Sequence, residues 1–433
     1  MSDDRRSAER KIGLARMWAR TKQVLTTDPQ NPADDDRVVD EEAAKALATH
    51  AGRLKGGLAK VAQLAAYDPG SNTTARATLG GLWDKAPSVS AGSIAGVIEA
   101  DLGRAPQALF ASWETNPLAA ASLGQVHAAR LHDGTEVVVK VQYPGVADAL
   151  RADLDDTSFV RKLAGSGIGR SLDAAAITTL ADAVRGELDY RAEAAAQTRF
   201  AAAWADDPVL RVPRVISELS SARVLTMTRA RGKTVVDIAA GGSPDIRRAA
   251  ALGIYKAAWG SPLAHGLLNA DPNPGNFLIE VADDGHVHVW CLDFGCAFEL
   301  PETARDNDRE LWWGLLDDDH ASAAERFRMA LARSGLLRKT DSMASVAHRD
   351  WERALQAPLA THGDFHWDPA YATALAETTG RVLSAGGVAL PADVLLLWRQ
   401  RLGAAAVIGM LDARAPFRRT LLELIGTGRR ALR

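Results

Sequence analysis

The chain has 433 residues, of which 47% are hydrophobic and 24% charged, and its formal net charge is -3. This composition is typical of globular proteins and argues against extensive disorder. The near balance of charge gives no general electrostatic reason to bind nucleic acid, so we expect no nucleic-acid partner. Any anionic ligand must therefore be bound by a local site.

Two cysteines occur, Cys291 and Cys296, so a disulfide framework is not available and a reducing compartment is the simplest expectation. The first residues carry charges of both signs and lack the apolar core of a signal peptide. The longest apolar run, 402–411, is shorter than the roughly 18 residues that cross a membrane. We therefore expect a cytoplasmic protein without a transmembrane span.

Residues 1–40 are expected to form a helix followed by an acidic linker. The helix, residues 10–25, has an apolar side and five basic residues elsewhere. Two interpretations stay open: it makes a peripheral contact with an anionic membrane, or it packs on the main body. The Pro- and Asp-rich stretch 26–46 is typical of a linker that ends where the next helix begins.

The periodicity changes from helical to strand-like near residue 119. Residues 125–142 are apolar on both sides of a His-Asp-Gly turn, which predicts a β-hairpin. The remaining predicted elements are a helical segment at 174–204, two strands within 212–232, a helix at 246–259, a hairpin around Asp283–Gly285, and helices from about residue 304.

A small sheet with one long helix, followed by a helical half, is the order of elements in kinase-like folds. We predict an α+β, two-lobed protein-kinase-like fold. It has a helical extension at 41–116, a small β-containing N-lobe at 117–232 and a helical C-lobe at 233–433.

The stretch "ADPNPGN" and the later "LDFG" place Asp271, Asn276 and Asp293 on either side of the second hairpin. Phosphoryl transfer needs one carboxylate to orient the attacking hydroxyl or water, and oxygen ligands for Mg²⁺ on the triphosphate. The spacing of Asp271 and Asn276 matches the kinase catalytic loop. Because Lys140 in a strand and Glu193 in a helix come before them in the expected order, we predict ATP and Mg²⁺ as ligands.

Other motifs favour ordinary structural roles. The glycine cluster at 165–169 lies between helical segments and is typical of a flexible connection. His286 and His288 share one face of a strand, but no third metal ligand is evident nearby. The chain after "DFG" lacks a long activation segment ending in Ala-Pro-Glu, which argues against a docking platform for protein substrates.

These motifs together resemble the UbiB/AarF family of atypical kinases, which includes aarF-domain kinases and coenzyme Q biosynthesis proteins. The resemblance covers about residues 45–300. It is carried by "KVAQ" (60–63), "PLAAASLGQVHAARL" (117–131), "VVVKVQYPGV" (137–146), "ELDYRAEAA" (187–195), "LTMTRARG" (225–232), "ADPNPGN" (270–276) and "LDFG" (292–295).

The resemblance implies a role for each of the nucleotide-site residues. Lys140 would contact the α- and β-phosphates and pair with Glu193, Asp271 would be catalytic, Asn276 and Asp293 would bind Mg²⁺, and Met227 would lie at the adenine hinge. An alanine-rich loop would take the place of the usual glycine-rich one, and alanine restricts the φ > 0 conformations that bring amides close to phosphates. The loop residues are Ala119, Ala120, Ala121 and Ser122.

Two further family signatures are implied to be regulatory and to lie over the region where a peptide substrate would bind. Their residues are Lys60, Gln63, Glu187 and Asp189. The chain departs from the family pattern at three positions. Ala62 replaces a glycine, and Asn269 and Asn273 replace histidines, so those side chains cannot titrate near neutral pH.

We therefore expect a Mg²⁺-dependent ATPase or phosphotransferase that binds ATP or ADP and acts on a small or lipid-like molecule. The resemblance links that molecule to quinone or isoprenoid-lipid metabolism. Two alternatives stay open: a small-molecule kinase of the choline or aminoglycoside type, and a scaffold that binds nucleotide without hydrolysing it. The sequence does not assign an oligomeric state.

Overall fold

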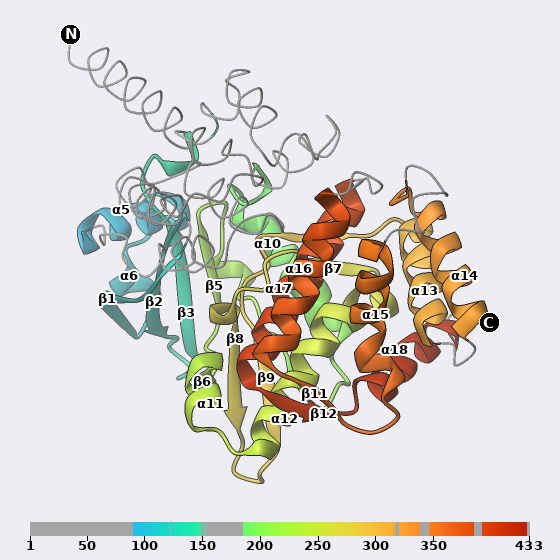
Figure 1. Cartoon of the computed structure of the whole chain (residues 1–433). Helices are drawn as coiled ribbons and strands as arrows, with labels where there is room; N and C mark the ends of the chain where they lie inside the picture. Colours follow the sequence, from blue (N-terminus) through green and yellow to red (C-terminus); the bar gives the residue numbers. More distant parts are fainter. Residues whose placement is uncertain are drawn as a thin grey trace, which may run out of the picture.

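The computed structural model describes residues 90–121, 123–148, 151, 185–316, 320–337, 346–384 and 392–430. The predictions for the helix at 10–25, for Lys60, Gln63 and Ser122, and for the glycine cluster at 165–169 lie outside these residues. The described part has a sheet-rich lobe and a larger helical lobe (Figure 1).

The small lobe is built on an antiparallel sheet in the order β1-β2-β3-β5. Its strands are β1 (Ser112–Ala121), β2 (Gly124–Arg130), β3 (Glu136–Gln142) and β5 (Val224–Thr228), and its helices are α5 (Ala91–Leu102), α6 (Pro106–Leu109) and α10 (Tyr190–Ala203). The predicted β2–β3 hairpin is present and turns at Gly134, whose φ of 89° suits glycine. Strand β1 begins at Ser112, before residue 117, where the small lobe was expected to start.

The sheet of the small lobe is covered on both faces, which explains why β3 is apolar on both sides. Val137, Val139 and Val141 are fully buried and pack with Ile94 and Ile98 of α5. The alternate residues of β3 point to the opposite face, where Tyr190 of α10 packs with β5. This second face carries Lys140 toward α10.

Helix α10 is shorter than the predicted helical segment at 174–204. It begins at Tyr190 because Asp189 has an extended backbone, with φ -126° and ψ 101°, and its side chain accepts a hydrogen bond from the Arg191 N–H. This is an N-cap, the position that favours Asp. The motif "ELDYRAEAA" (187–195) therefore has Glu187 and Asp189 before the helix and Glu193 in its first turn.

The large lobe contains a second sheet in the order β4-β9-β8-β6, whose first strand comes before β5 in the chain. Its strands are β4 (Leu210–Arg211), β6 (Lys233–Thr234), β8 (Phe277–Val281) and β9 (Val287–Cys291). Two strand pairs lie elsewhere in the lobe: β7 (Leu267–Asn269) with β10 (Ala297–Glu299), and β11 (Phe365–Trp367) with β12 (Ala413–Ala415). The β8–β9 hairpin is the one predicted around Asp283–Gly285.

Helices make up the rest of the large lobe. They are α11 (Val235–Gly241), α12 (Pro244–Tyr255), α13 (Glu302–Leu316), α14 (His320–Arg333), α15 (Val346–Ala360), α16 (Pro369–Ser384), α17 (Ala392–Leu411) and α18 (Phe417–Arg430). Short helical turns occur at η2 (Ser217–Leu219) and η4 (Pro274–Asn276). The predicted helix at 246–259 is α12, which starts after the N-cap Ser243 and continues into a π-helix, η3 (Lys256–His265).

Helix α17 is apolar nearly all round, as expected of a helix in the centre of a lobe. Its window Val394–Leu411 is long and apolar enough to cross a membrane, and 72% of that window is buried inside the fold. The sequence analysis expected no such run. Two arginines interrupt the window, and both lie in buried ion pairs: Arg399 with Asp271, and Arg401 with Asp308.

An aromatic cluster forms the centre of the large lobe. Trp367 lies in β11 and is 1% exposed, and its ring contacts those of Tyr255, Trp259, Tyr371 and Phe417 at centroid distances of 4.9–6.1 Å. Its indole N–H also donates to the Ala405 carbonyl of α17 at 3.1 Å. The cluster thereby joins α12, η3, α16, α17 and α18.

We predict that Trp367→Ala lowers the free energy of unfolding by roughly 3–5 kcal/mol, because it leaves a cavity in a close-packed core. Met329→Ala is the control, since Met329 is 48% exposed and such a change should cost less than about 0.5 kcal/mol. Urea denaturation followed by circular dichroism measures both. Equal losses in the two variants would contradict this account of the core.

Candidate functional site

A single buried ammonium, that of Lys140 in β3, lies at the centre of the site. Its Nζ is 2.7 and 2.9 Å from the carboxylate oxygens of Glu193 and 3.2 Å from Asp293 Oδ2. The three residues come from β3, α10 and the loop after β9. Residues predicted from separate motifs are thus brought together across both lobes.

Local structure explains how Glu193 reaches the lysine. It lies in the first turn of α10, where a carboxylate is favoured by the helix dipole, and it is 3% exposed. Tyr190, at the start of the same helix, places its ring 5.1 Å from Lys140 Nζ. The ammonium therefore lies between a carboxylate and an aromatic face, and both stabilise its charge.

Negative charge exceeds positive charge around Lys140. Glu187 approaches the same place, since a Cβ added to Gly295 would lie within 3.2–3.6 Å of Asp293, Glu187 and Glu193 atoms. Burial raises the pKa of Glu193 to about 7, and the Asp293 and Glu187 carboxylates act in the same direction. Although burial opposes it, Asp293 and Glu193 raise the pKa of Lys140 well above its usual value. Among the described residues, one ammonium thus contacts two carboxylates and a third lies nearby, a surplus that suits a bound cation.

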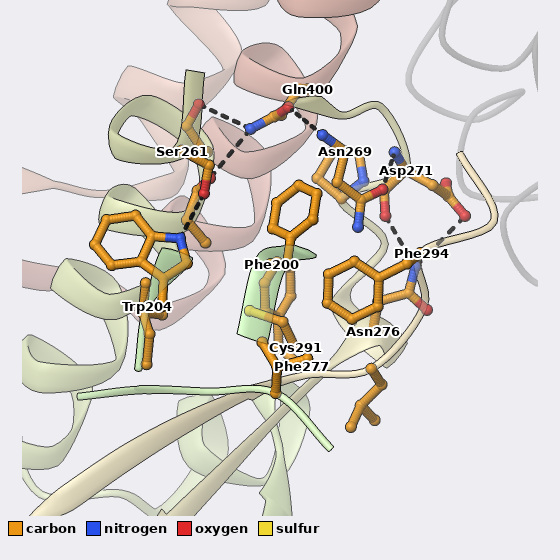
Figure 2. Close-up of a pocket in the computed structure, with 16 residues that line it drawn as sticks. Phe200, Trp204, Ser261, Asn269, Asp271, Asn276, Phe277, Cys291, Phe294 and Gln400 are labelled. Carbon is orange, nitrogen blue, oxygen red and sulfur yellow. Dashed lines mark hydrogen bonds between the residues drawn. The ribbon is translucent and has the colours of Figure 1, made fainter. Parts of the chain in front are cut away.

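Asp271 and Asn276 lie at opposite ends of the predicted catalytic loop, and a hydrogen bond joins them. Asn276 Nδ2 donates to the Asp271 carbonyl at 2.8 Å and approaches Asp271 Oδ2 at 3.4 Å (Figure 2). Since the amide nitrogen faces Asp271, the amide oxygen of Asn276 is the atom that could bind a metal. Oxygen ligands are those that Mg²⁺ prefers.

Asn269 connects the catalytic loop to the "DFG" segment. Its Nδ2 donates to the Asp293 carbonyl at 2.6 Å, and its Oδ1 accepts from the Asp271 N–H at 3.3 Å. The Asn269 N–H in turn donates to Gln400 Oε1 at 2.8 Å. An uncharged amide therefore supplies both donor and acceptor at a position where the family resemblance expects histidine.

An apolar cavity lies behind the "DFG" segment (Figure 2). The space between its walls, counted together with the open solvent that reaches it, is about 500 Å³, and Asp271 and Asn276 are among the residues that line it. Phe294 is 2% exposed and packs against Phe200 of α10 with ring centroids 4.9 Å apart. Burial also raises the pKa of the Cys291 thiol in the cavity wall to about 12, so that thiol stays protonated.

A family model for the ABC1 atypical kinase-like domain matches residues 81–327, more than half of the chain. The chain belongs to this family. The match confirms the resemblance to the UbiB/AarF atypical kinases that the sequence motifs suggested.

Individual relatives agree with the family match. The chain is 34% identical over 270 residues to atypical kinase COQ8B, mitochondrial, of Rattus norvegicus, and the match covers 62% of this chain and 50% of that protein. It is 34% identical over 211 residues to atypical kinase COQ8, mitochondrial, of Saccharomyces cerevisiae, covering 46% and 41%. The chain thus spans about half the length of these curated relatives.

A solved structure confirms the predicted two-lobed kinase-like fold. The structure of Rv3197 from Mycobacterium tuberculosis, in complex with erythromycin, matches with a TM-score of 0.62 and 27% identity. The match covers 92% of this chain and 100% of that chain.

The alanine-rich segment of this ABC1 domain is strand rather than open loop in the described residues. Ala119, Ala120 and Ala121 are the last residues of β1 and pair with β2 in an antiparallel register. Met227 lies in β5, opposite Val138 of β3, and is 5% exposed. Its sulfur faces Gln197 Nε2 of α10 at 3.5 Å. The nucleotide roles of these residues stay predictions.

The two acidic residues predicted to be regulatory point in different directions. Glu187 is 6% exposed and accepts a hydrogen bond from the Cys296 thiol at 2.8 Å. Asp189 is turned outward to the Arg191 guanidinium, which holds the pKa of that carboxyl below its usual value. Their regulatory role stays a prediction, and Glu187 is the one that faces the Lys140 cluster.

Sequence reasoning missed two residues of the site, Arg399 and Gln400 of α17. Arg399 Nη2 lies 3.5 Å from Asp271 Oδ1, and Gln400 bonds the catalytic loop at Asn269. Their segment gave no signal because it is a short polar interruption in an apolar helix. Neither cysteine forms a disulfide, and within the described ranges no cluster of His, Cys, Asp and Glu forms a ready-made metal site.

We predict that Lys140→Met destabilises the protein, and more so at high pH. At about pH 8 the free energy of unfolding should fall by roughly 3–5 kcal/mol, as it does when other buried ion pairs are broken. Without the ammonium, the folded-state pKa of Glu193 rises further above its ordinary value. A carboxyl with a raised folded-state pKa contributes stability at low pH that is lost as the pH rises through the folded value. The loss should therefore be smaller at about pH 5.

Chemical denaturation at the two pH values measures this effect. Lys256→Met is the matched control, because Lys256 pairs at 2.8 Å with one carboxylate, Asp207, which also accepts two backbone N–H bonds. The loss in free energy of unfolding of Lys256→Met should be smaller than that of Lys140→Met and should change less between the two pH values. A pH-independent loss in Lys140→Met would show that the surplus of carboxylates does not govern the site.

Proposed function

We propose that the chain binds Mg²⁺-ATP and Mg²⁺-ADP and catalyses hydrolysis of ATP or transfer of its terminal phosphoryl group to a small or lipid-like molecule. The observation that carries the proposal is the contact of one buried lysine with both the helix glutamate and the "DFG" aspartate. This is the arrangement that protein-kinase-like enzymes need for catalysis.

Each site residue then has a defined task. Lys140, held by Glu193, contacts the α- and β-phosphates. Asp293 Oδ2 and the amide oxygen of Asn276 would hold Mg²⁺, which offsets the charge of the phosphates when bound. Asp271 orients the attacking hydroxyl or water and receives its proton. The surplus of carboxyl groups around Lys140 supports the fit of a divalent cation.

Several residues are proposed to bind or cover the nucleotide. Ala119, Ala120 and Ala121 would bring the end of β1 over the phosphates, and Met227 would lie beside the adenine. Outside the described residues, Ser122 would complete the loop, and Lys60 and Gln63 would lie over the cleft. The resemblance to the family is the support for these roles.

A small or lipid-like acceptor is favoured over a protein substrate. The segment after "DFG" passes through β10 directly into α13 and leaves little chain for a docking platform. The proposed link to quinone or isoprenoid lipids comes from the family resemblance alone. The erythromycin complex of Rv3197 supports binding of a non-protein ligand by a relative.

Asp293→Asn should remove most of the stabilisation by Mg²⁺-nucleotide, because it deletes a charged metal ligand. A ligand at about 100 times its dissociation constant raises the free energy of unfolding of the parent by roughly 2.7 kcal/mol. A thermal-shift titration with Mg²⁺-ADP detects this stabilisation. Asp284→Asn is the control, since Asp284 lies in the β8–β9 turn and its side chain is 67% exposed. If Mg²⁺-ADP raises the melting temperature of Asp293→Asn as much as that of the parent, the metal assignment is refuted.

Asp271→Asn should retain nucleotide binding and lose turnover. The amide keeps the shape of the side chain but cannot accept the proton, so hydrolysis should fall by about a hundredfold or more. A phosphate-release assay, run beside the thermal shift, separates the two effects. Parental hydrolysis in this variant would exclude the catalytic role, and absence of turnover in the parent as well would favour the scaffold alternative.

A further inference from the structure

Helix α17 holds the catalytic loop through consecutive polar side chains. Gln400 Oε1 accepts the Asn269 N–H, while Gln400 Nε2 donates to the Ala257 and Ala258 carbonyls of the π-helix at 3.2 and 2.9 Å. Gly403 lies directly against Pro272, so that a side chain at this position would collide with the loop. The catalytic loop therefore takes its position from a segment beyond residues 81–327, the region that the family model matches.

Arg399 of the same helix is directed at the proposed catalytic carboxylate. Its Nη2 is 3.5 Å from Asp271 Oδ1, and the two side chains are 8% and 10% exposed. Asp271 Oδ1 is buried and accepts no hydrogen bond from the described part of the chain, whereas Oδ2 faces the Asn276 amide. Each carboxylate oxygen thus has its own neighbour.

The neighbouring arginine shows what a purely structural pair looks like in this helix. Arg401 makes two bonds of 2.6 Å to the two oxygens of Asp308 and lies over the rings of Trp259 and Trp312. Arg399 instead stays 3.5 Å from Asp271, and it leaves Oδ1 able to accept a bond from another group. Asp271 also lines the apolar cavity.

We propose that Arg399 is a positioning residue for phosphoryl transfer, which fixes the plane of the Asp271 carboxylate by attracting Oδ1 while Asn276 faces Oδ2. The inference rests on the proposed function. A guanidinium suits this task because it stays charged at every accessible pH and its planar shape limits its rotation. At 3.5 Å in a buried site, the attraction orients the carboxylate without occupying its acceptor site.

Steady-state ATP hydrolysis by the full chain, together with its melting temperature, tests this inference. Arg399→Ala should lower kcat by roughly tenfold to a hundredfold, since misplacing a catalytic group by about 1 Å costs on the order of a hundredfold. KM for Mg²⁺-ATP should stay within about twofold of the parent, because Arg399 does not take part in uniform substrate binding. Arg399→Lys should recover part of kcat and Arg399→Gln should not, because the first keeps the positive charge.

Arg401→Lys is the control for damage to α17. It weakens the buried pair with Asp308, so it should lower the melting temperature without a selective loss of kcat. If Arg399→Ala does not fold, the Arg399→Lys and Arg399→Gln variants make the same comparison. Equal kcat values in those two variants, or a loss in Arg399→Ala that follows the melting temperature alone, would overturn the inference.

Combining the variants separates this inference from the proposed function. In an Asp271→Asn background, Arg399→Ala should cause little further loss of turnover, because the group that it positions is already inactive. A full additional loss would mean that Arg399 acts elsewhere and would overturn the inference. If Asp271→Asn alone keeps parental turnover, the catalytic role proposed for Asp271 fails, and the inference that depends on it fails too.

Discussion

The site depends on one interaction, the contact of the Lys140 ammonium with Glu193 and Asp293. A buried ammonium loses its hydration, and only well-placed opposite charges compensate for that loss. Here the two carboxylates come from α10 and from the loop after β9. Because Glu193 is almost fully buried and cannot move away without leaving a buried charge unmatched, this contact fixes the sheet of the small lobe against α10. The contact with Asp293 joins the same sheet to the loop after β9.

The large lobe holds the other half of the site by different means. Neutral hydrogen bonds from Gln400 and close packing at Gly403 hold the catalytic loop on α17. The two halves meet where Asn269 donates to the Asp293 carbonyl. A charged cluster from the small lobe and a hydrogen-bonded loop from the large lobe are therefore joined through one amide side chain, and a shift of α17 would reach Asp293 as well as Asp271.

Local patterns predicted much of this fold. Alternating apolar residues and Gly turns identified both hairpins, and the order of motifs predicted one site for Lys140, Glu193 and Asp293, which lie together in the structure. The start of α10 was not predicted, because the cap at Asp189 lies within a run of good helix formers. Arg399 could not be predicted, since its partner lies far away in the chain and the pairing follows from how α17 packs rather than from any local pattern.

The balance of charge in the site has a consequence for how its ligands bind under the proposed function. Among the described residues, Lys140 contacts Glu193 and Asp293, and Glu187 lies near the same place. Burial and the other two carboxylates raise the pKa of Glu193 to about 7. Nucleotide phosphates entering alone would add negative charge to a region that already has an excess. A divalent cation reverses that sign, so metal and nucleotide should favour each other's binding reciprocally.

A metal bound between Asn276 and Asp293 would also draw Asp293 toward itself, and the ammonium of Lys140 would then be shared between Glu193 and phosphate instead of between two carboxylates. Under the proposed function, the contact that fixes the site is in this way also the one that nucleotide binding would rearrange.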